Sequence, residues 1–534
     1  MCELLAMSSR RSAWLRARSQ VLVAVSVILV AGCAAVRDDA PRTFSHAIEH
    51  PEDTALGRGF ASQLAATPGQ SGLHLLVSGQ EAFLARAALA ESAERTLDLQ
   101  YYIVADDATA TLLLYRALQA ARRGVRVRLL IDDINVIGRE LDLATLAAHP
   151  KFEVRVFNPF AWRGPLGLSR LFEYFGDSAR LNRRMHNKLW IADSAVAVVG
   201  GRNLGDAYFS AHGEYDFADL DLLAAGPVVA EVSRSFDEYW NSEWAVPITA
   251  LVGEPPQAAQ LERALAQMIA RAERFRETEY ARTLRATDLG RVLRGGRLAL
   301  VAAPAKAIYD TPAKPQIETA AQQGHIVSVL RRTILAARQE AILISPYFIP
   351  SERGAASLCE LARRGVRVRL LTNSLASTDV PVVHAGYARY RPRLLACGVE
   401  VHELRPGATP TGSARPGLSS GASLHAKAVV VDRKFGIIGS MNLDPRSRLA
   451  NTEIAVRIDS AVLGEQLGAL FEEAISPDQA FRVELTEPGN EHASLVWTGQ
   501  EGDKPVRYTS EPLASWWRRI FAGVLSALAP EELL

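Results

Sequence analysis

The most informative pattern along the chain is a helix-then-strand segment that occurs twice. The ten residues ARRGVRVRLL stand at 121–130 and again, identical at every position, at 362–371. In each copy a helical pattern ends at a glycine and a run rich in Val and Leu begins, which is typical of a parallel α/β unit. A further apolar strand precedes each copy, at 97–103 and at 342–349. The pattern therefore predicts an α/β protein built from two repeated halves.

The repeat and the segments around it divide the chain into six regions. In order, these are an N-terminal unit (1–33), a polar tether (34–74), a first half (75–245), a helical insert (246–322), a second half (323–480) and a C-terminal extension (481–534). The insert is expected to be helical because its apolar residues recur at helical spacing. A chain of 534 residues agrees with such a division, because one hydrophobic core seldom serves so many residues.

The C-terminal extension contains an apolar stripe at helical spacing beside two arginines. The stripe consists of Trp517, Phe521, Val524, Leu525 and Leu528, and the arginines are Arg518 and Arg519. Docking onto the protein's own core and shallow insertion at a membrane surface explain such a stripe equally well.

The N-terminal unit has four arginines followed by an apolar run from Val21 to Ala31. This run is short for a transmembrane span but suits the apolar part of a secretory signal. Its ending, VAGC, resembles a bacterial lipobox, which implies cleavage before Cys33 and acylation of its thiol. An uncleaved signal anchor is the alternative, and both attach the body to a membrane. Because the arginines favour retention of that end inside, the body is expected to face the periplasm.

The net charge argues against a nucleic-acid-binding surface, and the positions of the cysteines argue against a metal site. The chain's net charge of +1 becomes −2 once the +3 of residues 1–32 is set aside. A protein that grips nucleic acid normally has a basic excess, so no nucleic-acid partner is expected. The four cysteines lack zinc-like spacing, so no metal site is expected either. Cys359 and Cys397 lie in apolar stretches and are interpreted as small core residues.

A set of polar residues follows the repeat in each half. The segment MHNKLWIADSAVAVVGGRN supplies His186, Lys188, Asp193 and Asn203, and LHAKAVVVDRKFGIIGSMN supplies His425, Lys427, Asp432 and Asn442. The two members of every pair are 239 residues apart, so the repeat includes the polar residues as well as the scaffold.

The spacing of these residues suits chemistry on a phosphate. A His and a Lys two positions apart on a strand point to the same face, so each half offers an imidazole beside an ammonium. Each Asp is expected to hold the strand end and the lysine. The small residues before each Asn are expected to allow close approach of a ligand. Only seven lysines occur, and two occupy these positions, where a compact charge suits a phosphoryl oxygen.

The duplicated H-x-K-x-x-x-x-D motif is similar to that of the phospholipase D superfamily. Further segments, among them GGRNLGDAYF, FADLDLLAAGPVV, GSMNLDPRS and NTEIAV, resemble the cardiolipin synthases over most of the chain from about Leu75. The resemblance implies two phospholipase D-type α/β/α sandwich halves that face each other, with the active site between them.

The same resemblance implies roles for the motif residues, without a cofactor. His186 is the expected nucleophile, which forms a phosphohistidine, and His425 is the expected general acid and base. The groups expected to stabilise charge on the phosphate oxygens are Lys188, Lys427, Asn203 and Asn442. Asp221 in DLD and Glu453 in NTE are expected to orient the imidazoles.

The implied reaction is transfer of a phosphatidyl group to phosphatidylglycerol, which makes cardiolipin, with phosphatidylglycerol or phosphatidylethanolamine as donor. With water as acceptor, the same chemistry is hydrolysis by a phospholipase D, and the motif alone does not decide between the two. A secreted nuclease and a non-catalytic membrane scaffold are further alternatives. The complete second motif argues against a scaffold, and the charge argues against a nuclease.

Overall fold

The computed structural model describes residues 42–528 except 137, 162–172, 174–176, 213–214, 253, 255, 287–297, 315–324, 409–420 and 487–493. The expected signal and Cys33 lie outside these residues. Within the described part of the chain, no helix is long and apolar enough to cross a bilayer.

The first half is built on one mixed sheet. Among the described residues its strand order is β10-β1-β8-β6-β5-β2-β3-β4-β9. The strands are β1 (Ser71–Leu76), β2 (Thr96–Tyr101), β3 (Arg126–Asp132), β4 (Phe152–Phe157), β5 (Leu189–Ala192), β6 (Val196–Gly200), β8 (Asp221–Ala225), β9 (Ala245–Pro247) and β10 (Val301–Ala303). β2, β3 and β4 are parallel, whereas β5, β6 and β8 continue the sheet antiparallel.

The second half repeats this arrangement. Its order in the described structure is β11-β18-β17-β16-β12-β13-β14-β19-β20-β21. The strands are β11 (Ala305–Tyr309), β12 (Glu340–Ile344), β13 (Arg367–Asn373), β14 (Glu400–Leu404), β16 (Ala428–Val431), β17 (Phe435–Gly439), β18 (Ile454–Asp459), β19 (Ala480–Leu485), β20 (Leu495–Glu501) and β21 (Lys504–Tyr508). The run β18-β17-β16-β12-β13-β14 matches β8-β6-β5-β2-β3-β4, so the prediction of two repeated halves is confirmed.

The two ARRGVRVRLL segments form the same local structure. Each ends a helix, α4 (Ala108–Arg122) or α13 (Ser351–Arg363), and then starts the second parallel strand of its sheet. Gly124 and Gly365 lie between helix and strand with φ of +102° and +86°. Only glycine adopts this conformation without steric cost, so the chain turns sharply from helix to strand at these positions.

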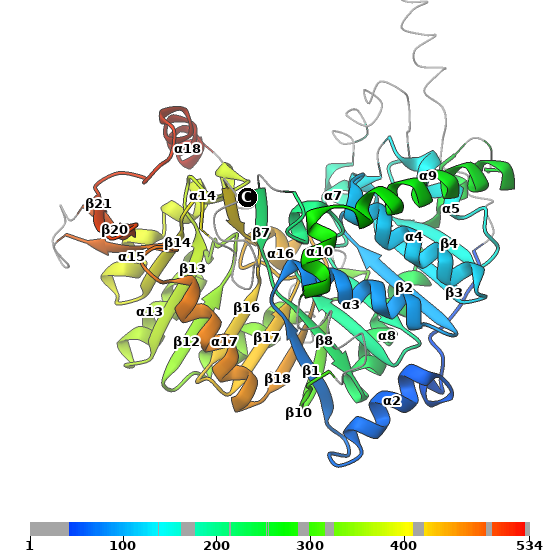
Figure 1. Ribbon diagram of the computed structural model, residues 1–534. Helices are drawn as coiled ribbons and strands as arrows, with labels where there is room; N and C mark the ends of the chain where they lie inside the picture. The colour runs from blue at the N-terminus through cyan, green and yellow to red at the C-terminus, as the bar shows by residue number, and fades with distance from the viewer. Residues whose placement is uncertain are drawn as a thin grey trace, which may run out of the picture.

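Helices cover both faces of each sheet (Figure 1). The outer face of the first sheet packs against α3 (Gly79–Ser92), α4 and α5 (Glu140–Leu146), and these helices are covered in turn by α9 (Ala258–Arg276) and α10 (Glu279–Ala286). The outer face of the second sheet packs against α12 (Ile326–Leu335), α13, α14 (Pro381–Ala388) and α15 (Arg391–Ala396). A third core between the sheets contains residues of α8 (Pro227–Trp240) and α17 (Ala461–Ala474) with apolar residues from both sheets. The two halves therefore share one interior.

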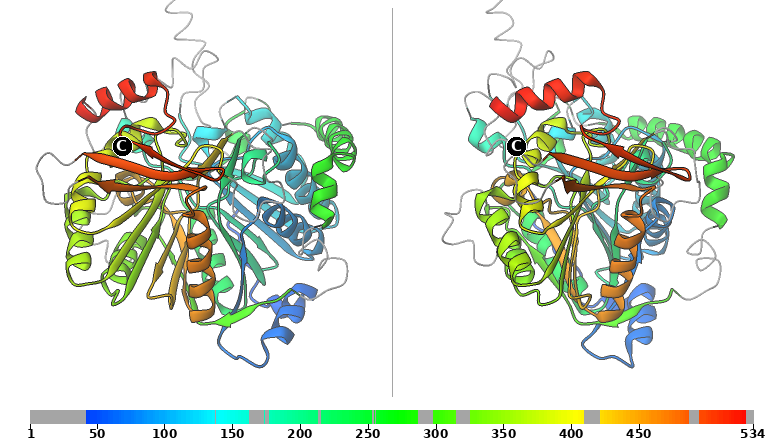
Figure 2. Two further views of the ribbon diagram at one scale, coloured as in Figure 1. Left: turned by 60° about the vertical axis from the view of Figure 1, so that its left-hand side comes forward. Right: turned by 90° about the vertical axis from the view of Figure 1, so that its left-hand side faces the viewer.

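Shorter elements connect this framework. Two short strands, β7 (Tyr215–Ala218) and β15 (Gly421–Leu424), pair in parallel and join the halves. The helical turns are η1 (Pro51–Asp53), η2 (Asp133–Asn135), α7 (Ser178–Leu181), η3 (Asp206–Tyr208), η4 (Ile248–Ala250) and α16 (Pro445–Leu449). β7 and α18 (Trp516–Leu528) lie at the same end of the molecule in Figure 1, and α2 (Ala55–Leu64) lies at the opposite end in Figures 1 and 2.

Three regions differ from the sequence-based expectations. The expected tether is folded from Arg42 onwards, since the Ala47 N–H donates to Asp237 on α8 at 2.8 Å and α2 follows. The expected helical insert contains α9 and α10, but it ends in two strands, because β10 joins the first sheet and β11 the second. The C-terminal extension supplies β20 and β21 to the second sheet before its helix.

Cys359 and Cys397, which are interpreted from the sequence as small core residues, form a disulfide that the sequence did not predict, and Cys359 is buried. Cys359 lies on α13 and Cys397 directly follows α15. These helices contact each other over the second sheet and bring the two Cα atoms to 5.3 Å, within the range that a disulfide spans.

Candidate active site

A strand pairing between the halves places His425. β7 and β15 run parallel, with Ala218 opposite Leu424. The residues that follow, Asp219 and His425, are therefore also adjacent. The His425 N–H donates to the Ala218 carbonyl at 2.8 Å, and His425 Nδ1 lies 2.6 Å from Asp219 Oδ2. The imidazole of the second half is therefore held by a carboxylate of the first.

A second pairing between the halves has the reciprocal arrangement and places His186. Met185 and Thr452 form an isolated parallel bridge. The His186 N–H donates to the Thr452 carbonyl at 2.9 Å, and His186 Nδ1 lies 2.9 Å from Glu453 Oε2. Here the first half supplies the imidazole and the second half the carboxylate, so neither half alone contains a complete site.

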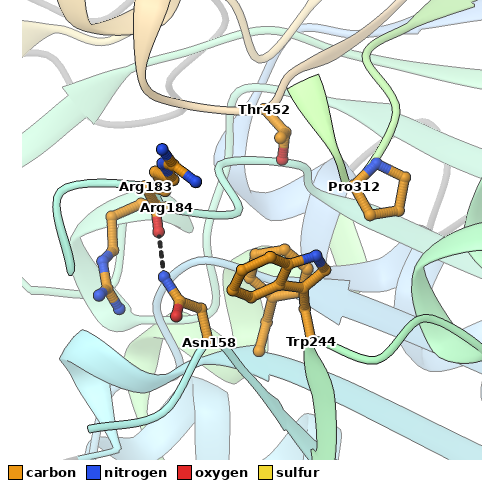
Figure 3. Close-up of a pocket in the computed structure, with 7 residues that line it drawn as sticks. Asn158, Arg183, Arg184, Trp244, Pro312 and Thr452 are labelled. Atoms are coloured by element: carbon orange, nitrogen blue, oxygen red, sulfur yellow. Dashed lines mark hydrogen bonds between the residues drawn. The ribbon is translucent and has the colours of Figure 1, made fainter. Parts of the chain in front are cut away.

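Behind the second pairing lies a small pocket on the seam between the halves. Figure 3 shows Thr452 and Pro312 on one side of it, opposite Asn158 and Trp244. The Asn158 amide donates to the Arg183 carbonyl at 2.8 Å and fixes the chain that leads to His186. The described residues that line this pocket include none of the motif residues, so it is a gap in the packing behind the site.

The expectation that Asp221 orients an imidazole is wrong, because Asp219 occupies that position. Asp221 instead forms an ion pair with Arg86 at 2.9 Å, and both side chains are completely buried. Arg202 lies 3.5 Å from Asp221 and donates to the Asp219 carbonyl. Asp221 thus anchors the strand that presents Asp219.

Strand register explains this correction. β6 and β8 pair Gly200 with Asp221, whereas the equivalent Gly439 of the second half pairs with Ala455. Asp221 therefore has no acidic counterpart. Two positions earlier in each half stand Asp219 and Glu453, which correspond to each other and contact the two histidines. Because side chains two apart share a face, the sequence DLD offers two similar candidates.

The glycines of the first motif make room for these carboxylates. A Cβ atom on Gly201 would lie 2.1 Å from Asp219 Oδ1, and one on Gly200 would lie 2.0 Å from Asp221 Oδ1. Both distances are far below a van der Waals contact. The expectation that these small residues admit a ligand is therefore corrected, since carboxylates of the protein fill the space.

Both motif lysines lie buried beside the histidines, but each His and Lys pair stands directly before its strand, β5 or β16, and not on the strand as expected. Lys188 Nζ donates to the His186 carbonyl, and Lys427 Nζ donates to the His425 carbonyl. Burial lowers the pKa of Lys427 to about 8, although Asp219 and other carboxylates oppose the shift. Burial also lowers the pKa of Lys188 well below its ordinary value. Each ammonium is therefore weakly solvated and available to an anionic ligand.

The two histidines share one electrostatic environment. Burial lowers the pKa of His186 to about 4, against the opposing charge of Glu453, and the ammonium of Lys427 contributes to the lowering. Burial likewise lowers the pKa of His425, and Lys188 contributes there. Lysines of both halves thus act on both histidines. A neutral histidine whose Nδ1–H donates to a carboxylate leaves the Nε2 lone pair free.

Aromatic rings enclose the two imidazoles. The Tyr102 ring lies edge-on to His186 with centroids 5.0 Å apart. Phe217 and Tyr208 lie 4.9 Å and 5.2 Å from the His425 ring. These contacts restrict rotation of the imidazoles and exclude water from their sides, which strengthens the electrostatic interactions inside the site.

Asp193 and Asp432 hold backbone outside the catalytic centre. Asp193 accepts the backbone N–H groups of residues 94–96, directly before and at the start of β2. Asp432 accepts those of residues 338–340 before β12. Their expected support of strand ends agrees with these bonds, but neither makes a described contact with the motif lysines.

The two asparagines differ in their surroundings. Asn203 Oδ1 accepts the Ile103 N–H at 3.0 Å, and its amide donates to the Tyr208 hydroxyl at 3.0 Å. Asn203 therefore positions an aromatic ring that contacts His425. Asn442 is buried, and its Oδ1 has no hydrogen-bond partner in the described structure.

Sequence reasoning missed a group of residues that hold Glu453. The Ser447 hydroxyl donates to Glu453 Oε1 at 2.7 Å, and the Glu453 N–H donates to Asp310 Oδ2 at 3.1 Å. Lys314 Nζ donates to the same Asp310 oxygen at 2.7 Å. Asp310 directly follows β11, and it has no spacing signal because this segment enters the site only through pairing of β11 with β18.

No group of three or more His, Cys, Asp or Glu side chains among the described residues could hold a metal ion. The positive charge beside the histidines comes from Lys188 and Lys427.

Comparison with known proteins assigns the family. A family model described as "Cardiolipin synthase, PLD-like domain" matches residues 87–240 and 330–475, which together form more than half of the chain and contain both motifs. The chain belongs to this family. This confirms the resemblance to the cardiolipin synthases. The match falls into two parts, and these coincide with the two repeated halves.

Individual relatives support the same assignment. Cardiolipin synthase C of Escherichia coli K12 is 41% identical over 472 residues, which cover 88% of this chain and 97% of the relative. An uncharacterized protein of Helicobacter pylori J99 is 32% identical and covers 96% and 99%. The crystal structure of phosphatidylserine synthase from Haemophilus influenzae Rd KW20 superposes with a TM-score of 0.51 at 13% identity, over 78% of this chain and 89% of that one. The last similarity concerns the fold alone.

Proposed function

We propose that this cardiolipin synthase-family enzyme transfers a phosphatidyl group to phosphatidylglycerol and so makes cardiolipin. The observation that carries the proposal is the pair of crossed contacts, His186 with Glu453 and His425 with Asp219, each formed between opposite halves. The name of the E. coli relative, cardiolipin synthase C, supports the choice of reaction, and phospholipids are accordingly the substrates.

In the first step, His186 Nε2 attacks the phosphorus of the donor lipid. A P–N bond forms, the P–O bond to the headgroup breaks, and the departing alkoxide takes a proton from His425. A neutral His186 at physiological pH suits this attack, and its pKa of about 4 supports the assignment. Burial lowers the pKa of His425, and its 2.6 Å contact with Asp219 opposes this lowering, which supports the imidazolium that must donate the proton.

In the second step, His425 takes a proton from the free hydroxyl of phosphatidylglycerol. The resulting alkoxide attacks phosphorus, the P–N bond breaks, and His186 is regenerated. Lys188 and Lys427 stabilise the non-bridging phosphate oxygens in both steps, since both ammonium groups are buried beside the histidines. Asn442 contributes an amide N–H at the edge of the same site, whereas Asn203 acts through Tyr208, to which its amide donates.

The test is analysis of lipid products by mass spectrometry. Purified protein receives phosphatidylglycerol alone, or with phosphatidylethanolamine whose acyl chains are deuterated, so that the donor is identified. We expect cardiolipin from the wild type and from the control variant His212→Ala, an exposed histidine outside the site. We expect none from His186→Ala or His425→Ala. Phosphatidic acid as the sole product would instead assign a hydrolytic phospholipase D.

The proposal includes attachment to a membrane through Cys33, with the body in the periplasm. The disulfide between Cys359 and Cys397 supports it, because disulfides persist in oxidising compartments and are rare in the cytosol. Intact-mass analysis of detergent-extracted protein tests it. We expect a chain that begins at an acylated Cys33. A mature chain that retains residues 1–32 would assign a signal anchor instead.

A further inference from the structure

The C-terminal helix α18 exposes its large apolar side chains. Trp516, Trp517, Ile520 and Val524 are between 51% and 65% exposed, and Leu513 before the helix is 48% exposed. We call these five residues the apolar ridge. Within the helix, Ile520 lies three and four positions after the two tryptophans and Val524 four positions later, so these four side chains share one face, and Leu513 precedes them.

Two described residues of α18, Arg518 and Ala522, contact the body on the side away from the ridge. Ala514 and Ala522 are buried with Leu375 and with Ala385 of α14 in a small cluster. Arg518 donates to the backbone carbonyls of residues 376 and 378. Within α18, Ala522 is buried and Arg518 is partly buried, whereas Trp516 and Trp517 are exposed. Of the two explanations for the sequence stripe, docking of these side chains onto the protein's own core does not hold for Trp517 and Val524.

The loop under α18 connects the ridge to the active site. Between the two carbonyls that Arg518 binds and α14 lies Asp379, which accepts a hydrogen bond from Tyr347 at 2.7 Å. Burial lowers the pKa of Lys427, and Asp379 is among the carboxylates that oppose the shift, so its charge acts on the site. Figure 1 places α18 at the same end of the molecule as β7, the strand that leads to Asp219.

Charge and side-chain chemistry indicate the partner. The residues of α18 include Arg518 and Arg519 and no carboxylate, so the helix is cationic. The rings of Trp516 and Trp517 stack with centroids 3.7 Å apart. Tryptophans beside arginines are typical of segments that lie in the interface of a bilayer, where apolar rings enter the acyl boundary and cations meet anionic headgroups.

We propose that the apolar ridge inserts into the surface of a bilayer that contains anionic phospholipid, and that this contact turns the active site towards the lipid. The choice of partner rests on the proposed function, because the substrates of that reaction reside in a bilayer. The contact is additional to any attachment at Cys33, since it involves the opposite end of the chain and fixes orientation as well as proximity.

The test measures insertion itself and requires no turnover. Full-length protein is bound to vesicles of phosphatidylglycerol and phosphatidylcholine, with the phosphatidylcholine acyl chains brominated or unmodified. Bromine quenches tryptophan fluorescence only on contact. The ridge signal is the part of the quenching that disappears in the variant Trp516→Phe with Trp517→Phe. We expect a clear ridge signal in the wild type and loss of most of it when Ile520 and Val524 are both changed to Asp.

A matched control changes two exposed apolar residues far from α18. Leu141→Asp with Val462→Asp should retain the ridge signal, because these side chains are 52% and 56% exposed and belong to other helices. Circular dichroism establishes that each variant is folded. Equal fluorescence of the wild type on brominated and unmodified vesicles would overturn the proposal, even if the protein makes cardiolipin. Shielding of Trp516 and Trp517 that appears without lipid and rises with protein concentration would assign the ridge to a second copy and also overturn it.

Discussion

His425 Nδ1 lies 2.6 Å from Asp219 Oδ2, although the two residues belong to opposite halves of the chain. His186 and Glu453 form the reciprocal contact at 2.9 Å. Each contact follows a short parallel pairing between the halves, so the same backbone geometry places both imidazoles. Both halves are therefore required for the site, because each supplies a carboxylate to the histidine of the other.

Substitution of Asp219 should reduce catalysis, whereas substitution of Asp221 should reduce stability. In Asp219→Asn we expect kcat to fall by about 100-fold or more, because the imidazolium of His425 loses the charge that stabilises it as a general acid. We expect nearly unchanged thermal unfolding. In Asp221→Asn we expect a loss of about 3 kcal/mol or more in the free energy of unfolding, because Arg86 remains buried without its ion-pair partner. Kinetics and calorimetry on both variants provide the check, and the reverse pattern would restore Asp221 as the orienting residue.

The activity should decrease as pH rises through about 8, the pKa to which burial lowers Lys427. The ammonium form is charged below this pKa and neutral above it. Its stabilisation of the phosphate is therefore present at lower pH and lost at higher pH. The measurement is kcat/KM of the free enzyme between pH 6 and 10, which reports groups of the unbound site. In Lys427→Arg the residual activity should lack this decrease, since a guanidinium stays charged across the range. An unchanged alkaline limb in that variant would assign it to another group.

Reduction of the disulfide should weaken the second half without a direct effect on the site. Cys359 and Cys397 close a loop with a sequence separation of 38 residues. We expect Cys359→Ser with Cys397→Ser to lower the free energy of unfolding by about 2 to 4 kcal/mol, the usual contribution of such a cross-link. Calorimetry of the wild type with and without a reductant, beside the double variant, measures this. A reductant that lowers the unfolding temperature of the double variant equally would contradict the assignment.

The sequence predicted the repeated halves and both motifs because these depend on local patterns. Identical ARRGVRVRLL segments form equivalent helix ends and strands, and each His and Lys pair lies directly before a strand of its half. Partners across the seam have no such signal. Asp219 and Asp221 differ by one period of a strand, and only the register of β8 against β6 distinguishes them.

Two further features depend on tertiary packing that no periodicity encodes. Asp310 reaches the backbone of Glu453 only because β11 pairs with β18, far from it in sequence. The stripe at the C-terminus was predicted as a helix with an apolar face, but the side that packs against the body is decided by the carbonyls that Arg518 binds. Helical spacing identifies a face, and it does not reveal what that face contacts.

The most direct test of the assignment of His186 as nucleophile and His425 as general acid uses phosphatidyl-p-nitrophenol, a donor whose leaving group departs without protonation. Nucleophilic attack then proceeds in the absence of the general acid. We expect His425→Ala to release a stoichiometric burst of nitrophenolate and to carry the phosphatidyl group on the peptide that contains His186, as detected by mass spectrometry after alkaline quenching. His186→Ala should give neither. A burst from His186→Ala, with the phosphatidyl group on His425, would contradict the assignment of the nucleophile.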